Sequence, residues 1–257
     1  MSRGSIIYIY VYNCIKYMLI STILMVHVRI RGSTTSTKLL SSFYLSKKLF
    51  TTFAMAKKTA ILLMADGAEE MEAVITADVL RRAGIDVTIA SITGNDCIKC
   101  SRDVKICADT QLDAVKNNSF DAVILPGGLG GSKALASVKV GELLKKQESE
   151  GRVIAAICAA PTALKAHGIA PGKQVTSYPA MKDQLVNYYK YLEDIVVTDV
   201  INFISSILFV IIVSAGNIIT SRGPATAYAF GLAIVEKLLN KEAALPVAKG
   251  MLYENYK

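Results

Sequence analysis

The sequence has no Trp, only two His residues and no acidic residue before Asp66. The shortage of histidine argues against a zinc site, because Cys97 and Cys100 form a single CxxC pair with neither His27 nor His167 nearby. A structural zinc site needs four such ligands. Five cysteines are an odd number in a long chain, which does not indicate a disulfide framework. We therefore expect ordinary reduced thiols, a reducing compartment and no metal.

The positive charge of the chain is concentrated in its N-terminal segment, which has no acidic residue. Residues 1–58 contain nine Lys or Arg and no acid, while the remainder has 20 basic and 21 acidic residues, a balance of −1. The net charge of +8 therefore belongs to the N-terminal segment. The body shows no basic cluster of the kind that binds nucleic acid, so we expect no sequence-specific nucleic-acid partner.

Residues 1–55 are predicted to be a leader outside the fold. Half of residues 33–52 are Ser or Thr, with scattered Lys, which is typical of a mitochondrial transit peptide. The apolar stretch at 5–26 could be a signal-like or anchoring segment. Alternatively, the leader is an extended upstream start, because Met55 opens a run that leads directly into the first strand. We expect a cytoplasmic or mitochondrial protein, or both, with the nucleus as a further location.

Residues 56–257 are predicted to form a single α/β domain. Apolar runs typical of buried strands occupy residues 59–65, 86–92, 121–128 and 152–158. Helical patterns occupy residues 69–84, 132–149, 159–168 and 224–239, and Gly84 stands where the first should end. A short hairpin or edge strand is expected at 100–109 and another strand at 174–179. This alternation predicts a doubly wound, mostly parallel sheet with helices on both faces, an α/β/α sandwich.

One segment does not fit this pattern. Residues 200–221 carry no charge and are long enough for a membrane span. Such a span would separate the last strand and helix from their sheet, so we expect no membrane contact for the core domain. Removing residues 200–215 joins Asp199 to Gly216, and Asp-Gly between two β-rich runs is a strong hairpin signal. We interpret residues 200–215 as an atypical insertion, such as a retained intron translated in frame.

Cys158 is the predicted nucleophile. It stands between the apolar strand 152–158 and the helix that Pro161 opens, with small Ala159 and Ala160 beside it. A helix N-terminus lowers the pKa of a thiol, and the strand–turn–helix arrangement is analogous to the nucleophile elbow of hydrolases. The alternative is a buried, inert cysteine.

Two further loops should reach the same edge of the sheet. Gly127 and Gly128 follow one buried strand, and their N–H groups could serve an oxyanion or carbonyl oxygen. The loop after the first strand can bring Glu69, Glu70 or Glu72 toward the thiol, where a carboxyl group can exchange protons. For any single glutamate, a solvated helix start remains the alternative.

Several motifs, in order, resemble the ThiJ/PfpI family, in its parkinsonism-associated deglycase (DJ-one) branch. They are GAEEMEAVITADVLRRAGIDVTIAS, CSRDVKICAD, ILPGG, AAICAAPTAL and ITSRGPATAYAFGLAIVE. The resemblance covers about residues 57–250 apart from 200–215, and it implies a flavodoxin-like fold and a homodimer.

The resemblance also implies roles for particular residues. Cys158 matches the oxidation-sensitive cysteine, Glu72 the glutamate that contacts it, and Gly128 and Ala159 the backbone oxyanion donors. The pocket residues implied are Arg102, Arg222 and Pro224, and the secondary redox thiols are Cys100 and Cys107. Two positions depart from the pattern: Tyr178 stands where members often have His, and Leu129 follows the paired glycines.

The function that the resemblance implies is glutathione-independent conversion of glyoxals to hydroxy acids, without a cofactor. It also implies protein deglycase activity on glycated proteins and a role in oxidative stress. Small aldehydes such as methylglyoxal would be the substrates. The alternative is a non-enzymatic redox sensor or chaperone that uses the same cysteine, because an accessible thiolate oxidises readily. A peptidase of this family would have His after the nucleophile, where this chain has Ala159. A glutamine amidotransferase would need a downstream His and Glu that complete a triad with the cysteine, and we find no such pair in the sequence.

Overall fold

The fold is taken from a computed structural model that describes residues 57–198, 217–254 and 256. The predicted leader and the predicted insertion at 200–215 lie outside the described residues. The described residues belong to one compact unit.

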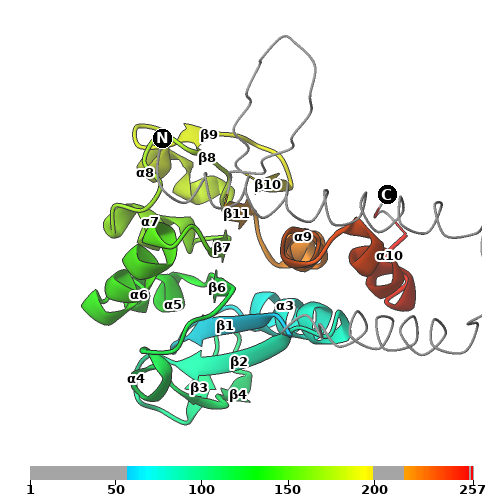
Figure 1. The fold of residues 1–257 in the computed structure, drawn as a ribbon. Coiled ribbons are helices and arrows are strands. Elements are labelled where there is room, and N and C mark those ends of the chain that lie inside the picture. The colour runs from blue at the N-terminus through cyan, green and yellow to red at the C-terminus, as the bar shows by residue number, and fades with distance from the viewer. Residues whose placement is uncertain (1–56, 199–216, 255, 257) are drawn as a thin grey trace, which may run out of the picture. The chain divides into compact units, whose positions relative to one another are not determined.

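The centre of this unit is a seven-stranded sheet in the order β10-β11-β7-β6-β1-β2-β5 (Figure 1). All neighbouring strands are parallel except β10 and β11. The strands are β1 (Thr59–Met64), β2 (Asp86–Ser91), β5 (Thr110–Gln111), β6 (Ala122–Leu125), β7 (Val153–Ile157), β10 (Val196–Thr198) and β11 (Ile218–Ser221). The predicted mostly parallel sheet is confirmed.

Helices cover both faces of the sheet, as Figure 1 shows. They are α3 (Glu70–Arg82), α4 (Leu112–Val115), α5 (Leu129–Ala134), α6 (Val138–Ser149), α7 (Pro161–Ala166), α8 (Lys182–Leu185), α9 (Ala227–Leu238) and α10 (Lys241–Gly250), with 3-10 turns η1 (Pro179–Met181) and η2 (Pro224–Thr226). Helices α3, α9 and α10 pack on one face, and α4 to α8 contribute to the core on the other.

Alternation along β1 explains why the sheet can be buried on both sides. Leu62 and Met64 belong to the core beneath α3 and α9, whereas Ile61 and Leu63 belong to the opposite core. Successive side chains of a strand point to opposite faces, so a continuous apolar run supplies both cores at once. The predicted α/β/α sandwich is therefore confirmed.

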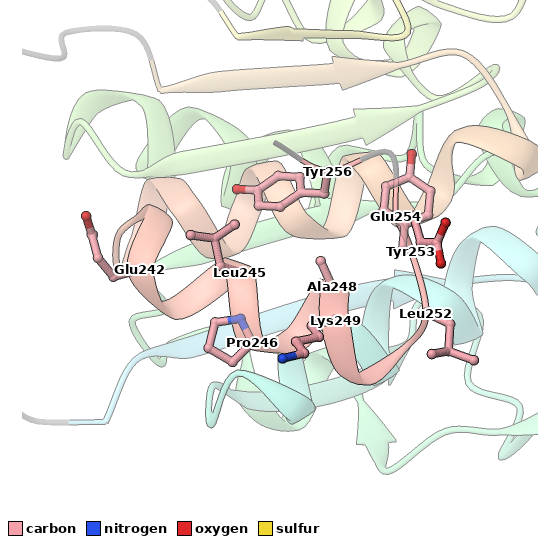
Figure 2. A pocket seen from close by; sticks show the side chains of 9 residues that line it. All are labelled: Glu242, Leu245, Pro246, Ala248, Lys249, Leu252, Tyr253, Glu254 and Tyr256. Carbon is pink, nitrogen blue, oxygen red and sulfur yellow. The ribbon is translucent and has the colours of Figure 1, made fainter.

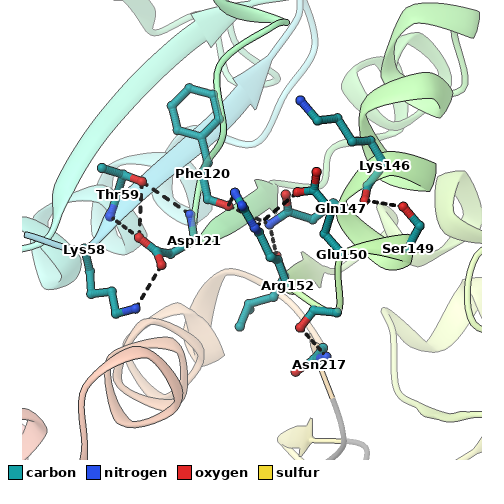
Figure 3. Close-up of polar contacts among 12 residues, drawn as sticks. Lys58, Thr59, Phe120, Asp121, Lys146, Gln147, Ser149, Glu150, Arg152 and Asn217 are labelled. Carbon is teal, nitrogen blue, oxygen red and sulfur yellow. Dashed lines mark hydrogen bonds and ion pairs between the residues drawn. The ribbon is translucent and has the colours of Figure 1, made fainter. Parts of the chain in front are cut away.

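Polar contacts tie the central strands together at their amino-terminal ends (Figure 3). Asp121, just before β6, accepts hydrogen bonds from the backbone N–H of Thr59 and from Lys58 Nζ, each at 2.9 Å. Gln147 on α6 donates to the carbonyls of Phe120 and Val153 at 3.1 and 3.0 Å. These contacts fix the strand order at the edge opposite to Cys158.

Three predicted elements differ from those observed. Residues 132–149 form parts of two helices, because Ser137 adopts an extended conformation and starts α6 anew. The strand predicted at 174–179 shrinks to β8 (Gln174–Val175), which pairs with β9 (Lys190–Tyr191) outside the main sheet. The hairpin predicted at 100–109 begins earlier, with β3 (Cys97–Lys99) and β4 (Lys105–Cys107).

The strands on either side of the predicted insertion pair as a hairpin. Val196 lies opposite Ser221 and Thr198 opposite Ile219 in the antiparallel β10–β11 pair. This register brings together the two β-rich runs that the Asp-Gly signal predicted, and the predicted pairing is confirmed. Among the residues that the structure describes, no helix has the length and apolar character needed to cross a membrane.

Candidate active site

Cys158 occupies a strained turn directly after β7. Its φ is +63°, a left-handed conformation that is unfavourable for a residue with a Cβ. Two backbone hydrogen bonds hold it there: its N–H donates to Ser221 at 3.0 Å, and its carbonyl accepts from Tyr178 at 2.8 Å. The strained strand-to-helix turn is the geometry of a nucleophile elbow, which exposes a side chain above the end of a sheet.

The paired glycines after β6 allow other groups to approach the thiol. A Cβ on Gly127 would lie 2.6 Å from the Cβ of Cys158 and 2.8 Å from Oε2 of Glu72. Gly128 has a φ of +82°, and a Cβ there would lie 2.2 Å from the carbonyl oxygen of Gly67. Only glycine fits at either position.

The N–H groups of this edge have two different acceptors. Those of Gly128 and Ala159 act on the sulfur of Cys158 and favour its anion, so these two remain candidate oxyanion donors. The N–H of Gly127 instead donates to Oε2 of Glu72 at 2.7 Å. The prediction that Gly127 serves an oxyanion is therefore wrong, and its role is to position Glu72.

Glu72 is the glutamate of the three that lies against the thiol. It belongs to the first turn of α3, where Glu69 caps its backbone N–H at 2.7 Å, and its side chain is fully buried. Burial raises its pKa to about 7, against the opposing effects of the Gly127 N–H and the Cys158 thiol. Oε1 is buried and has no hydrogen-bond partner among the described residues.

The protonation of Glu72 controls the state of Cys158. Burial, together with the charge of ionised Glu72, raises the pKa of the Cys158 thiol. The expectation that the helix start alone lowers this pKa is therefore wrong. A proton on Glu72 removes the repelling charge and makes the carboxyl a donor toward the sulfur, beside the Gly128 and Ala159 N–H groups. The thiolate is therefore favoured more when Glu72 is protonated than when it is ionised.

A cavity of about 580 Å³ opens above this pair. Its lining comprises Gly67, Glu69, Ser101, Arg102, Gly128, Leu129, Gly130, Cys158, Ala159, Tyr178, Ala180, Met181 and Pro224. Two of the predicted pocket residues, Arg102 and Pro224, are among them. Arg222 is not, because its guanidinium donates to the carbonyl of Glu193. The two departures from the family pattern, Leu129 and Tyr178, both line the cavity and are largely exposed at 65% and 48%.

Several lining residues carry no local sequence signal. Ser101, Ala180 and Met181 come from the hairpin turn and from the segment around η1. Loops of this kind have no periodicity that places them, so only long-range contacts bring them to the cavity.

The three remaining cysteines of the described domain differ in their bonding. Cys97 and Cys107 form a disulfide across β3 and β4, so the prediction of ordinary reduced thiols is wrong for both. Cys100 is free but buried, and burial raises the pKa of its thiol to about 11. Cys107 is therefore not a free redox thiol here, and Cys100 is a weakly nucleophilic one.

Other features of the described residues show no comparable chemistry. Nε2 of His167 is hydrogen bonded to the carbonyl of Leu135 at 2.8 Å, a structural contact. A second cavity, of about 860 Å³, lies along α10 and the chain end (Figure 2) and shares no lining residue with the first. In the ranges 57–198 and 217–254, no group of His, Cys, Asp or Glu is arranged to hold a metal ion.

Comparisons with known proteins identify the family of this chain. The model of the DJ-1/PfpI family matches residues 57–237, well over half of the chain. Protein dj-1beta of Drosophila melanogaster is 55% identical over 196 residues, which cover 76% of this chain and 97% of that protein. Glutathione-independent glyoxalase DJR-1.2 of Caenorhabditis elegans is 41% identical over 191 residues, covering 74% and 92%.

Solved structures show the same fold. The crystal structure of Drosophila melanogaster DJ-1beta matches with a TM-score of 0.69 at 55% identity, over 76% of this chain and 98% of that one. Oxidized Toxoplasma gondii DJ-1 matches with a TM-score of 0.68 at 33% identity, over 77% and 99%. On the family match, the identities and the fold together, this chain belongs to the DJ-1/PfpI family.

Proposed function

We propose that this chain is a glutathione-independent glyoxalase that uses Cys158 as nucleophile and Glu72 as proton carrier. The observation that carries the proposal is the buried Glu72 carboxyl held against the Cys158 thiol by the Gly127 N–H. A family relative named as a glutathione-independent glyoxalase supports the same activity. A carboxyl with a pKa near 7 can both accept and donate a proton at neutral pH.

The proposed reaction converts methylglyoxal and water to lactate. The Cys158 thiolate adds to the aldehyde carbon, and the former carbonyl oxygen takes a proton to give a hemithioacetal. Ionised Glu72 removes the hydrogen from that carbon and passes it to the neighbouring carbonyl oxygen, which gives an enediol. Glu72 then takes the proton of the first hydroxyl group and delivers it to the neighbouring carbon, leaving a thioester. Water then attacks the thioester, which releases lactate and restores the thiol. The N–H groups of Gly128 and Ala159 would stabilise the oxyanions.

The test is turnover of methylglyoxal by the purified chain. Cys158→Ala should abolish lactate formation, and Glu72→Gln should lower it about a hundredfold or more. Glu142→Gln, on the exposed side of α6, is the matched control and should leave the rate unchanged. Lactate formed at the normal rate by either site variant would refute the proposal.

Protein deglycase activity is the extension of this proposal to glycated proteins. The early adducts of methylglyoxal with protein thiols and amines carry the same two-carbon core, and the 580 Å³ cavity is open enough to receive one. Release of free lactate from a preformed adduct, measured after excess aldehyde is removed, separates this activity from simple scavenging.

A redox sensor or chaperone is the second candidate for the same site. A sulfinic acid forms when the Cys158 thiol reacts with two molecules of peroxide, which are reduced to water. The Gly128 and Ala159 N–H groups would favour that anion. Glu72→Gln should abolish turnover while it leaves part of the peroxide reactivity, as mass spectrometry would detect. Equal loss of both would remove the distinction between the two roles.

A homodimer is the proposed assembly. Met71 and Val74 on α3 are about half exposed, at 50% and 51%, on the face of the helix away from the core. Sedimentation analysis of the chain with both residues changed to Lys should show a monomer, and a dimer that survives both changes would place the interface elsewhere.

The cellular location is also a proposal. A fluorescent fusion that begins at Met1 should reach mitochondria if residues 1–55 act as a transit peptide, and one that begins at Met55 should stay in the cytoplasm or enter the nucleus.

A further inference from the structure

The β3–β4 hairpin carries the cysteine pair that the catalytic chemistry does not use. Cys97 and Cys107 are directly opposite in a two-stranded sheet of three residue pairs, separate from the main sheet (Figure 1). A two-stranded hairpin is marginally stable by itself. A covalent link between Cys97 and Cys107 therefore adds to the backbone pairing and to the burial of Ile98, which also hold the two strands in place.

The two linked cysteines are accessible and their neighbour is not. Cys97 and Cys107 are both exposed, whereas Cys100 in the same hairpin is 4% exposed. Thiol–disulfide exchange requires attack by a thiolate along an open path to one of the two sulfurs. Dissolved thiols can therefore reach this disulfide. Cys97 is not one of the two secondary cysteines, Cys100 and Cys107, that the family resemblance matched.

The strand that carries Cys97 continues into the wall of the Cys158 cavity. The Lys99 carbonyl accepts from the N–H of Gly67, and the Lys99 N–H donates to Oδ1 of Asp66, both at 2.8 Å. The Ser101 N–H donates to the carbonyl of Ala68 at 2.8 Å. Four residues of these two segments line the cavity: Gly67, Glu69, Ser101 and Arg102.

The same hairpin also holds the start of the helix that carries Glu72. Ser101 Oγ and the backbone N–H of Arg102 donate to the carboxylate of Glu70, each at 2.9 Å. Glu70 begins α3, and Glu72 lies in its first turn. Motion of the hairpin therefore reaches the cavity wall and the proton carrier through hydrogen bonds that the structure contains.

We propose that Cys97 and Cys107 form a reversible redox site whose disulfide holds the cavity wall in place around Cys158. Reduction by a small thiol or dithiol breaks the S–S bond through a mixed disulfide, leaves two cysteine thiols, and converts two reductant thiols to their disulfide. The reduced hairpin keeps its three residue pairs but loses the covalent link. The wall then opens more often, and Cys158 becomes more accessible to bulky reagents.

The first measurement asks whether the pair responds to redox conditions. The full chain is equilibrated with glutathione at a series of reduced-to-oxidised ratios, free thiols are trapped with iodoacetamide, and peptides are identified by mass spectrometry. The peptides that contain Cys97 and Cys107 should be linked under oxidising ratios and both alkylated under reducing ratios. Free thiols at every ratio would overturn the proposal.

The second measurement asks whether the link reaches the cavity, and it does not require enzyme activity. Amide hydrogen exchange at Gly67 and Ser101 should be about threefold or more slower in the linked chain than in Cys97→Ser or Cys107→Ser. Amides of helix α6, on the opposite face of the sheet from α3, serve as the internal reference, and Cys158→Ser, which keeps the disulfide, is the matched control. The wild-type chain treated with a dithiol should resemble the two Ser variants. Equal exchange in linked and unlinked forms would refute the coupling.

Discussion

Replacing Glu72 by Gln should change how stability depends on pH, in a direction set by the burial of this carboxyl. Its pKa rises from the ordinary value of 4.5 to about 7 in the folded protein. The folded state therefore binds this proton more tightly than the unfolded state, so the free energy of unfolding falls as pH rises from 4.5 to 7. Each pKa unit corresponds to about 1.36 kcal/mol, so the full effect is about 3 kcal/mol.

The assay is denaturant unfolding of the wild type and Glu72→Gln at pH values from 4 to 9. Many carboxyls titrate in this range, so the informative quantity is the difference between the two proteins at each pH. Wild-type stability relative to the variant should be highest near pH 4, should fall by about 3 kcal/mol up to pH 7, and should then level off. If the difference in free energy of unfolding between wild type and Glu72→Gln stays constant or rises with pH, the pKa of Glu72 is not raised by burial, and the reasoning fails.

Three further substitutions test other parts of the geometry. Gly127→Ala should lower turnover of methylglyoxal about a hundredfold or more. The new Cβ would lie 2.6 Å from the Cβ of Cys158 and 2.8 Å from Oε2 of Glu72, so one of these two side chains must move. A normal rate would refute this packing. Arg222→Ala should leave the KM for methylglyoxal within about twofold, since its guanidinium bonds to Glu193 outside the cavity; a large increase would place it in the substrate site. Gly84→Ala should lower the free energy of unfolding by about 1 kcal/mol without changing activity, as denaturation would measure, because φ is +81° there and the space around it is open.

The sequence alone predicted most of the architecture because its signals are local. The apolar run of β1 supplies alternate residues to both cores, and Gly84, with its φ of +81°, lies directly after α3 and its C-cap Ala83. The strand ends also placed Cys158, Gly128 and the loop before Glu72 at one edge, since the carboxyl ends of neighbouring parallel strands meet there.

Only the tertiary structure decided which groups meet at that edge. It directed the Gly127 N–H to Glu72 instead of an oxyanion, turned Arg222 away from the cavity, and joined Cys97 to Cys107. It also reversed the expected influence on Cys158, because burial and a neighbouring carboxylate outweigh a short helix start. Pairings of this kind depend on atoms brought together from distant parts of the chain, whereas periodicity and turn chemistry describe only neighbours in sequence.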